Sequence, residues 1–257
     1  MVFVAQNSLN QPSNLYALIF DNLEADSIEE VIAGIKVKTI SEGRLSKENE
    51  IQEWISEEIK NFDKKLVTLE NGAEAFLYYN KAATEKMPMV TMLHGGPFSA
   101  APADMFLANR LMFLLSGFSV LNVAYRGTIS YGQKQLQTLI GSIGVNDVAD
   151  CGEMTKRAVE AFPDIVDEKR IGVYGGSHGG FLTSWLLGHS EYKHLFKAGV
   201  SWNPVLNMSY MVASTDIPDW MYACVLNQPN NYFLSMEDNQ KFYERSPITV
   251  AKEVVSP

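Results

Sequence analysis

From residue 87 to residue 205, continuous apolar runs alternate with stretches whose apolar residues recur at helical spacing. The apolar runs predict four strands, at 87–93, 118–127, 170–176 and 197–205. The stretches between them predict helices at 105–117, 145–162 and 178–189. Apolar strands separated by amphipathic helices are typical of a mostly parallel sheet with helices on both faces. The pattern therefore predicts an α/β fold.

The first 80 residues follow a different pattern. Residues 1–20 indicate two strands around a polar turn, and such a hairpin is only marginally stable unless it joins a larger sheet. Residues 48–62 carry apolar residues at helical spacing and predict a helix. Residues 65–80 predict a second hairpin, because Asn71-Gly72 is the strongest short signal for a hairpin turn.

Composition narrows the class of protein. The 257 residues carry a net charge of −9, which argues against nucleic acids and anionic membranes as partners. The only two cysteines, Cys151 and Cys224, cannot build a disulfide framework, which fits a reducing compartment. The apolar start of the chain is too short for a signal peptide, and no stretch reaches the ~20 apolar residues of a membrane span. We therefore expect a soluble cytoplasmic protein.

The strand at 170–176 runs into four glycines that surround one serine. Residues 175–179 read Gly-Gly-Ser-His-Gly and match G-x-S-x-G, the strand-to-helix turn that exposes a nucleophilic serine. Ser177 is the predicted nucleophile, and the backbone N–H of His178, at a helix N-terminus, is one predicted oxyanion donor. A glycine-rich nucleotide-binding turn is the alternative, but the lysine of a phosphate-binding loop is missing.

A second glycine motif follows the strand at 87–93. Residues 94–97 read His-Gly-Gly-Pro, and in α/β-hydrolases a loop at this point supplies the second oxyanion N–H. Gly96 is the predicted donor, because glycine lets the backbone approach a carbonyl oxygen closely. His94 is predicted to brace that loop. A plain tight turn is the alternative. The strand-to-helix turn at residues 175–179, two βα units further along the chain, favours the functional interpretation.

The base and acid of a triad are harder to place. In this fold the order along the chain is serine, acid, histidine, so the base has to follow Ser177. His178 diverges from the serine as its neighbour, while His189 and His194 lie at the far end of the following helix. The acids that follow the fourth strand lie in a segment of loops and helices: Asp216, Asp219 and Asp238. We expect a C-terminally truncated hydrolase domain whose triad acid and histidine would come after Pro257.

The motifs together point to a known family. Residues 94–97, 124–133, 175–181 and 203–220 resemble the catalytic domain of the acylaminoacyl-peptidases, a group within the prolyl oligopeptidase family of serine peptidases. The resemblance implies an α/β-hydrolase domain at 49–257 that lacks its last strands. It implies that residues 1–48 are the last strands of an N-terminal β-propeller.

The same resemblance implies removal of an N-acylated amino acid from short N-acylated peptides through a Ser177 acyl-enzyme. Apolar walls suit such a substrate, and the candidate substrate-binding residues are Phe98, Arg126, Ile217 and Trp220. For Arg126 an internal ion pair is favoured, and the other three are also candidates for ordinary packing. No cofactor and no metal are expected. Two alternatives stay open: another hydrolase of this fold (a dipeptidyl peptidase or an esterase) and an inactive truncated binding partner. The formation of a homo-oligomer also stays open.

Overall fold

The structure, a computed structural model, describes most of the chain. The described residues are 2–8, 11–20, 35–41, 54–55, 57–100, 108–229 and 233–257. They fall into two compact units, of which the first comprises Met1–Asn61 and Pro102–Met112 and the second Phe62–Ala101 and Phe113–Pro257.

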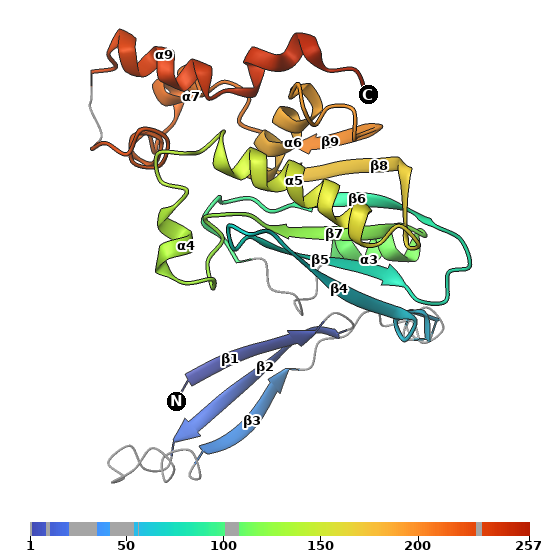
Figure 1. The fold of residues 1–257 in the computed structure, drawn as a ribbon. Helices are drawn as coiled ribbons and strands as arrows, with labels where there is room; N and C mark the ends of the chain where they lie inside the picture. The colour runs from blue at the N-terminus through green and yellow to red at the C-terminus, as the bar shows by residue number, and fades with distance from the viewer. Residues whose placement is uncertain are drawn as a thin grey trace. The chain divides into compact units, whose positions relative to one another are not determined.

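The first unit contains a three-stranded antiparallel sheet in the order β1-β2-β3 (Figure 1). Its strands are β1 (Val2–Ser8), β2 (Gln11–Phe20) and β3 (Ile35–Ser41). The predicted pairing within residues 1–20 is confirmed, and its turn lies outside the described residues. Residues 54–55 and 57–59 are helical, within the helix predicted at 48–62. The domain boundary at residue 48 and the propeller origin of this sheet stay predictions.

The second unit is built on a six-stranded sheet in the order β4-β5-β7-β6-β8-β9 (Figure 1). Its strands are β4 (Phe62–Thr68), β5 (Glu74–Asn80), β6 (Met87–Leu93), β7 (Ser119–Ala124), β8 (Val166–Gly176) and β9 (Ala198–Trp202). The last four strands of that order are parallel, and the predicted hairpin β4-β5 joins antiparallel to β7. The predicted mostly parallel sheet is therefore confirmed, with β8 longer and β9 shorter than expected.

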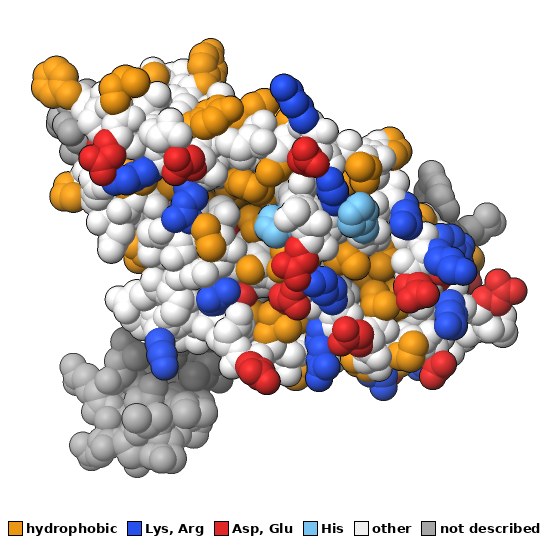
Figure 2. Space-filling model, turned by 45° about the horizontal axis from the view of Figure 1, so that its top comes forward, with side chains coloured by type: hydrophobic (Ala, Val, Ile, Leu, Met, Phe, Trp, Pro, Cys, Tyr) orange, Lys and Arg blue, Asp and Glu red, His pale blue; other side chains and the backbone are white. Residues whose placement is uncertain are grey.

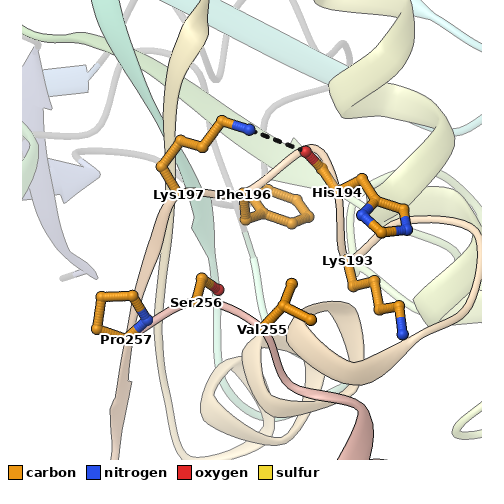
Figure 3. A pocket seen from close by; sticks show the side chains of 7 residues that line it. All are labelled: Lys193, His194, Phe196, Lys197, Val255, Ser256 and Pro257. Atoms are coloured by element: carbon orange, nitrogen blue, oxygen red, sulfur yellow. Dashed lines mark hydrogen bonds between the residues drawn. The ribbon is translucent and has the colours of Figure 1, made fainter.

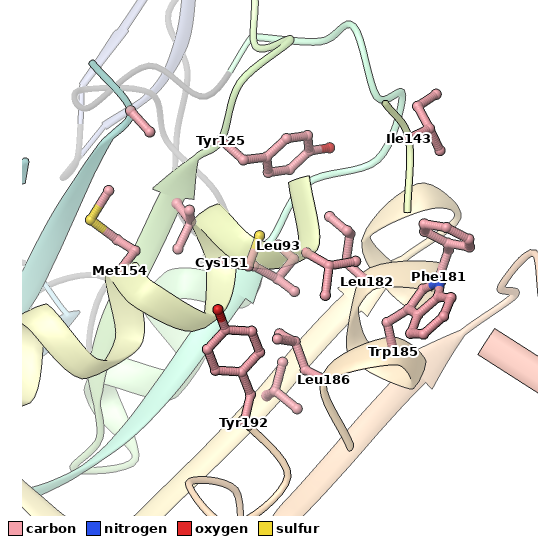
Figure 4. Packing of buried hydrophobic residues seen from close by; sticks show 14 of the residues in the cluster. Leu93, Tyr125, Ile143, Cys151, Met154, Phe181, Leu182, Trp185, Leu186 and Tyr192 are labelled. Atoms are coloured by element: carbon pink, nitrogen blue, oxygen red, sulfur yellow. The ribbon is translucent and has the colours of Figure 1, made fainter. Parts of the chain in front are cut away.

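Helices cover both faces of this sheet. On one face lie α5 (Asn146–Ala161) and α6 (His178–Gly188), and Figure 4 shows side chains of both helices meeting over the strands. The other face is reached by the end of α3 (Ala108–Leu115), where the ring of Phe113 contacts that of Tyr174 edge-on at 5.6 Å. Both faces of the central strands are thus covered, which explains why every residue of β7 is buried.

Short helices follow the sheet, as the sequence predicts. They are α7 (Met208–Ser214), α8 (Asp219–Met221), η1 (Tyr222–Leu226), α9 (Met236–Glu244) and η2 (Pro247–Glu253), and the five-residue α4 (Gln133–Gln137) precedes α5. Asn207 and Ser235 cap α7 and α9 with their side chains. Figure 2 shows hydrophobic side chains interspersed with charged ones on one face of the molecule. Among the described residues, no helix is long and apolar enough to cross a membrane.

Strand β9 is the exposed edge of the parallel sheet. Among the described strands it pairs only with β8, although Gly199 N also donates to Pro257 O. Val200 is 58% exposed and Trp202 is 68% exposed on this strand. An apolar strand with unpaired backbone groups is a template for association with further chains.

We therefore expect the 257-residue polypeptide to self-associate through β9. A lysine at such an edge opposes pairing, so Val200→Lys should reduce light scattering without lowering the melting temperature appreciably. Met236→Lys is the matched control, because Met236 is 84% exposed but lies on α9 rather than on the edge. Equal effects of the two substitutions would show that general surface hydrophobicity, and not the edge, drives association.

Candidate active site

Ser177 occupies the corner between β8 and α6. Its backbone has φ 55° and ψ −119°, a left-handed conformation that costs a non-glycine residue of order 1–3 kcal/mol. The serine is exposed, while His178 and Gly179 directly after it are buried. The corner therefore presents the hydroxyl to the outside of a densely packed junction, as the predicted nucleophile elbow requires.

The glycines around Ser177 are required by contact distances. A Cβ atom added at Gly179 would lie 2.1 Å from the carbonyl oxygen of Leu93, at the end of β6. A Cβ atom added at Gly175 would lie 2.3 Å from the carbonyl oxygen of Gly179. The end of β8, the start of α6 and the end of β6 thus meet backbone to backbone, without room for a side chain.

The same junction brings the second glycine motif to the serine. Strands β6 and β8 are parallel neighbours, so the loops that follow them both begin at the carboxyl end of the strands. A Cβ atom added at Gly95 would lie 3.3 Å from Ser177 Cβ and 3.9 Å from its Oγ. Gly96 has φ 129°, where a side chain would be strained. The structure therefore brings together the two motifs that the sequence places eighty residues apart.

His94 braces the glycine loop from inside. Its Nδ1 lies 2.8 Å from Gly95 O, and because a carbonyl oxygen only accepts, Nδ1 carries the proton. Its Nε2 lies 2.8 Å from Thr128 Oγ1, and its ring stacks on that of Tyr125 at 4.3 Å. Burial lowers the pKa of His94 from 6.5 to about 4, against the opposing effect of the hydrogen bond to Gly95. The ring is therefore neutral near pH 7.

His178 turns its side chain away from the serine. Its Nε2 donates to Asp147 Oδ2 at 2.8 Å, and its ring stacks on Phe181 with the centroids 4.9 Å apart. This geometry agrees with the expectation that His178 is not the base. As the first residue of α6, His178 has a backbone N–H without a partner inside the helix. That N–H is free to serve as the predicted oxyanion donor.

A cavity of about 320 Å³ opens at the serine. Three of the four predicted substrate-binding residues line it together with Ser177: Phe98, Ile217 and Trp220. The predicted oxyanion donors, Gly96 and His178, also line it. Sequence reasoning missed the remaining lining residues, which are Pro97, Val205, Met211 and Cys224. Val205 and Met211 lie within residues 203–220 and Pro97 lies within residues 94–97, so these motifs carried the available signal for three of the four.

Arg126, the fourth candidate, is not among the residues that line the cavity. Its guanidinium binds both oxygens of Asp150, at 2.7 Å from Nη2 to Oδ1 and 2.8 Å from Nε to Oδ2. Its backbone N–H also donates to Asp150 Oδ2 at 2.9 Å. The Arg126 side chain is 18% exposed and that of Asp150 is 1% exposed. The structure thus contains the internal ion pair that the sequence favoured over a contact with substrate.

The later histidines lie away from the serine. His189 follows the C-terminal end of α6, about 18 Å along the helix from Ser177. His194 lines a different cavity, beside Lys193, Lys197 and Pro257, where Lys197 Nζ donates to the His194 carbonyl oxygen (Figure 3). Among the described residues that line the Ser177 cavity, none carries a carboxylate and the one histidine is His178. The base and the acid stay unassigned within the described residues.

With this geometry in place, comparison with known proteins identifies the class of protein. The Prolyl oligopeptidase family model matches residues 105–257, which is more than half of the chain. The chain therefore belongs to the prolyl oligopeptidase family of serine peptidases. The family predicted from the sequence motifs is confirmed.

Among its relatives, the chain is 42% identical to acylamino-acid-releasing enzyme of Arabidopsis thaliana over 66% of this chain and 22% of that enzyme. It is 34% identical to the Mus musculus acylamino-acid-releasing enzyme over 69% of this chain and 24% of the enzyme. It thus spans about a quarter of the length of these curated relatives. The fold matches Pyrococcus horikoshii acylaminoacyl peptidase with a TM-score of 0.73 and 22% identity, over 99% of this chain and 37% of that chain. The predicted α/β-hydrolase fold is confirmed.

The contact between Gly179 and Leu93 predicts that Gly179→Ala will disrupt the corner. Because the new Cβ meets a backbone oxygen that cannot move aside, we expect loss of soluble folded protein or a fall of several degrees in melting temperature. Gly172→Ala on β8 is the matched control, since its Cβ would lie 3.5 Å from Ala198 O, an ordinary contact. Thermal unfolding compares the two, and a Gly179→Ala variant as stable as Gly172→Ala would contradict this account of the elbow.

The buried neutral His94 predicts a loss of stability in acid. Below pH 6.5 the unfolded chain takes up a proton that the folded ring refuses until about pH 4, so the free energy of unfolding falls over that interval. The difference between 6.5 and 4, at about 1.36 kcal/mol for each pH unit, corresponds to about 3 kcal/mol. His94→Gln should therefore show a shallower decline than the unsubstituted protein in urea unfolding between pH 7 and pH 4.5. The exposed His194→Gln variant is the control, and parallel declines for all three proteins would be evidence against a neutral His94.

Proposed function

We propose that this protein is an acylaminoacyl-peptidase-type serine peptidase, which releases an N-acylated amino acid from short N-acylated peptides. The observation that carries the proposal is the composition of the cavity at Ser177. Apart from Ser177, Gly96 and His178, its walls are apolar side chains and a thiol, and the described residues that line it include no carboxylate. The names of the relatives, acylamino-acid-releasing enzymes, support the same activity.

The cavity distinguishes an acylated from a free N-terminus by charge. A free peptide N-terminus is an ammonium group, and burying it without a carboxylate costs several kcal/mol. An acylated terminus is neutral and presents an apolar acyl group with one amide. Burial, together with the charge of the exposed Asp219, raises the pKa of the Cys224 thiol, so this part of the wall also stays neutral. The walls therefore suit an acylated residue better than the cationic end of a dipeptide.

In the proposed reaction Ser177 Oγ attacks the carbonyl carbon of the acylated residue. The oxygen of that carbonyl gains negative charge and is held by the N–H groups of Gly96 and His178. The C–N bond then breaks, the leaving amine takes up the proton that came from the serine, and an acyl-enzyme ester forms at Ser177. Water hydrolyses the ester to release the N-acylated amino acid and restore the hydroxyl.

The test compares acetyl-alanyl p-nitroanilide with alanyl p-nitroanilide as substrates of the complete natural polypeptide. We expect kcat/KM to favour the acetylated substrate by roughly 100-fold or more, because the cavity offers no partner for an ammonium group. Ser177→Ala should remove the activity, whereas Ser190→Ala, an exposed serine just beyond α6, should retain it. Faster cleavage of a free-amine substrate, alanyl p-nitroanilide for an aminopeptidase or alanyl-alanyl p-nitroanilide for a dipeptidyl peptidase, would indicate the corresponding activity, and hydrolysis of p-nitrophenyl butyrate alone would indicate an esterase. Either result would reject the proposal.

A further inference from the structure

A buried hydrogen bond between His178 and Asp147 lies beside the proposed oxyanion site, and the steps of the proposed reaction given above do not use it. Asp147, in the first turn of α5, accepts a hydrogen bond from His178 Nε2 at 2.8 Å. The Asp147 side chain is fully buried and that of His178 is 3% exposed. The second carboxylate oxygen accepts the backbone N–H groups of Gly144 at 2.8 Å and Val148 at 3.0 Å. The carboxylate is therefore held on both sides, at a helix N-terminus that favours its charge.

The pair constrains the backbone at the start of α6. The imidazole of His178 and its backbone N–H share one Cα atom, so a ring that cannot rotate also fixes the direction of the N–H. Asp147 holds one edge of the ring. Phe181 stacks on it at 4.9 Å, and the Tyr125 ring centroid lies 6.1 Å away. The His178 side chain thus has a single orientation available, and the N–H points out of the N-terminus of α6.

The second proposed donor is tied to the same cluster of side chains. The hydrogen bond from His94 Nδ1 to Gly95 O grips the carbonyl end of the peptide whose other end is the Gly96 N–H. Tyr125 stacks on His94 and its hydroxyl donates to His94 O at 2.9 Å. Burial raises the pKa of Tyr125 well above its usual value, so this hydroxyl keeps its proton. Tyr125 therefore lies between His94, which holds the peptide of the Gly96 donor, and His178, which carries the other donor. Figure 4 shows Tyr125 among the buried side chains at the end of β7.

From this geometry we infer that Asp147 is a positioning residue for the oxyanion site, acting through the His178 side chain on the His178 backbone N–H. The inference rests on the proposed function, because it assigns Asp147 a part in that same reaction. Asp147 touches neither Ser177 nor the cavity, so its effect is on the placement of a donor. Such placement matters because a donor displaced by about 1 Å can cost about 100-fold in rate.

A purely structural role is the alternative, and the same helix offers a matched control. Asp150 lies one turn further along α5, is as deeply buried as Asp147, and pairs with Arg126. The Asp150 carboxylate accepts hydrogen bonds from Arg126 and, at 2.7 Å, from Asn71 Nδ2, rather than from a residue of α6. If the two pairs serve only stability, their loss should affect catalysis alike. If Asp147 positions the donor, only its loss should lower kcat.

The experiment measures kcat, KM and melting temperature for Asp147→Asn and Asp150→Asn in the complete natural polypeptide. The substrates are acetyl-alanyl p-nitroanilide and p-nitrophenyl butyrate. Both variants should melt at lower temperature. Asp147→Asn should lower kcat about 10- to 100-fold with KM changed little, because the donor acts in the transition state. Asp150→Asn should keep kcat within about twofold. Equal losses of kcat in the two variants would overturn the inference and leave the proposed function intact.

A second pair of variants covers the case in which Asp147→Asn does not fold. His178→Gln retains the backbone N–H and a side-chain N–H that reaches Asp147, whereas His178→Leu retains only the bulk of the ring. We expect His178→Leu to lose kcat to the same extent as Asp147→Asn, and His178→Gln to retain a kcat several-fold higher than that of His178→Leu. Equal kcat for the two would refute positioning through the hydrogen bond.

The two substrates separate the two proposals. Cleavage of the ester alone would remove the acylaminoacyl-peptidase assignment while the variants are still compared on the ester. An unsubstituted protein inert toward both substrates would overturn both proposals.

Discussion

The active corner depends on a backbone contact between three elements. Gly179 at the start of α6 lies against the Leu93 carbonyl at the end of β6, and Gly175 at the end of β8 lies against Gly179. Side chains normally separate a helix from the sheet on which it packs, and here the absence of Cβ atoms lets the helix start almost in contact with the strands. The positive φ of Ser177 occurs at this contact, where the surrounding packing holds the strained backbone. The same contact brings the loop after β6, which His94 and Tyr125 brace, next to the serine.

That contact explains which parts of the site could be predicted from the sequence. The glycines of the G-x-S-x-G motif indicate a strand-to-helix corner. The alternation of apolar strands with helices places the two glycine loops at the same end of the sheet. Ser177, Gly96 and the apolar candidates Phe98, Ile217 and Trp220 consequently line one cavity, as expected. Their roles in binding and catalysis stay predictions.

The parts that sequence reasoning missed depend on how distant elements cross. Nothing in the neighbourhood of Asp147 along the chain indicates a partner 31 residues away. The contact exists because α5 and α6 pack side by side on the same face of the sheet. The ion pair of Arg126 could be predicted only in part. A buried arginine requires an acidic partner, but the sequence does not identify which acidic residue it is. Likewise, an Asn-Gly turn predicts the β4-β5 hairpin but not that β5 will pair with β7.

The distribution of charged side chains differs between the cavity at Ser177 and the buried layer beneath the corner. Toward the cavity the described lining residues include no carboxylate and are mostly apolar, so the attraction of an oxyanion there to N–H groups would be strong. Beneath the corner, two carboxylates on α5 are buried, and each is paired with a cationic or proton-donating side chain and with backbone N–H groups. A buried carboxylate without such partners would repel the developing oxyanion and destabilise the fold. Pairing satisfies both carboxylates and ties α5 to the loop after β7 through Arg126 and to the start of α6 through His178.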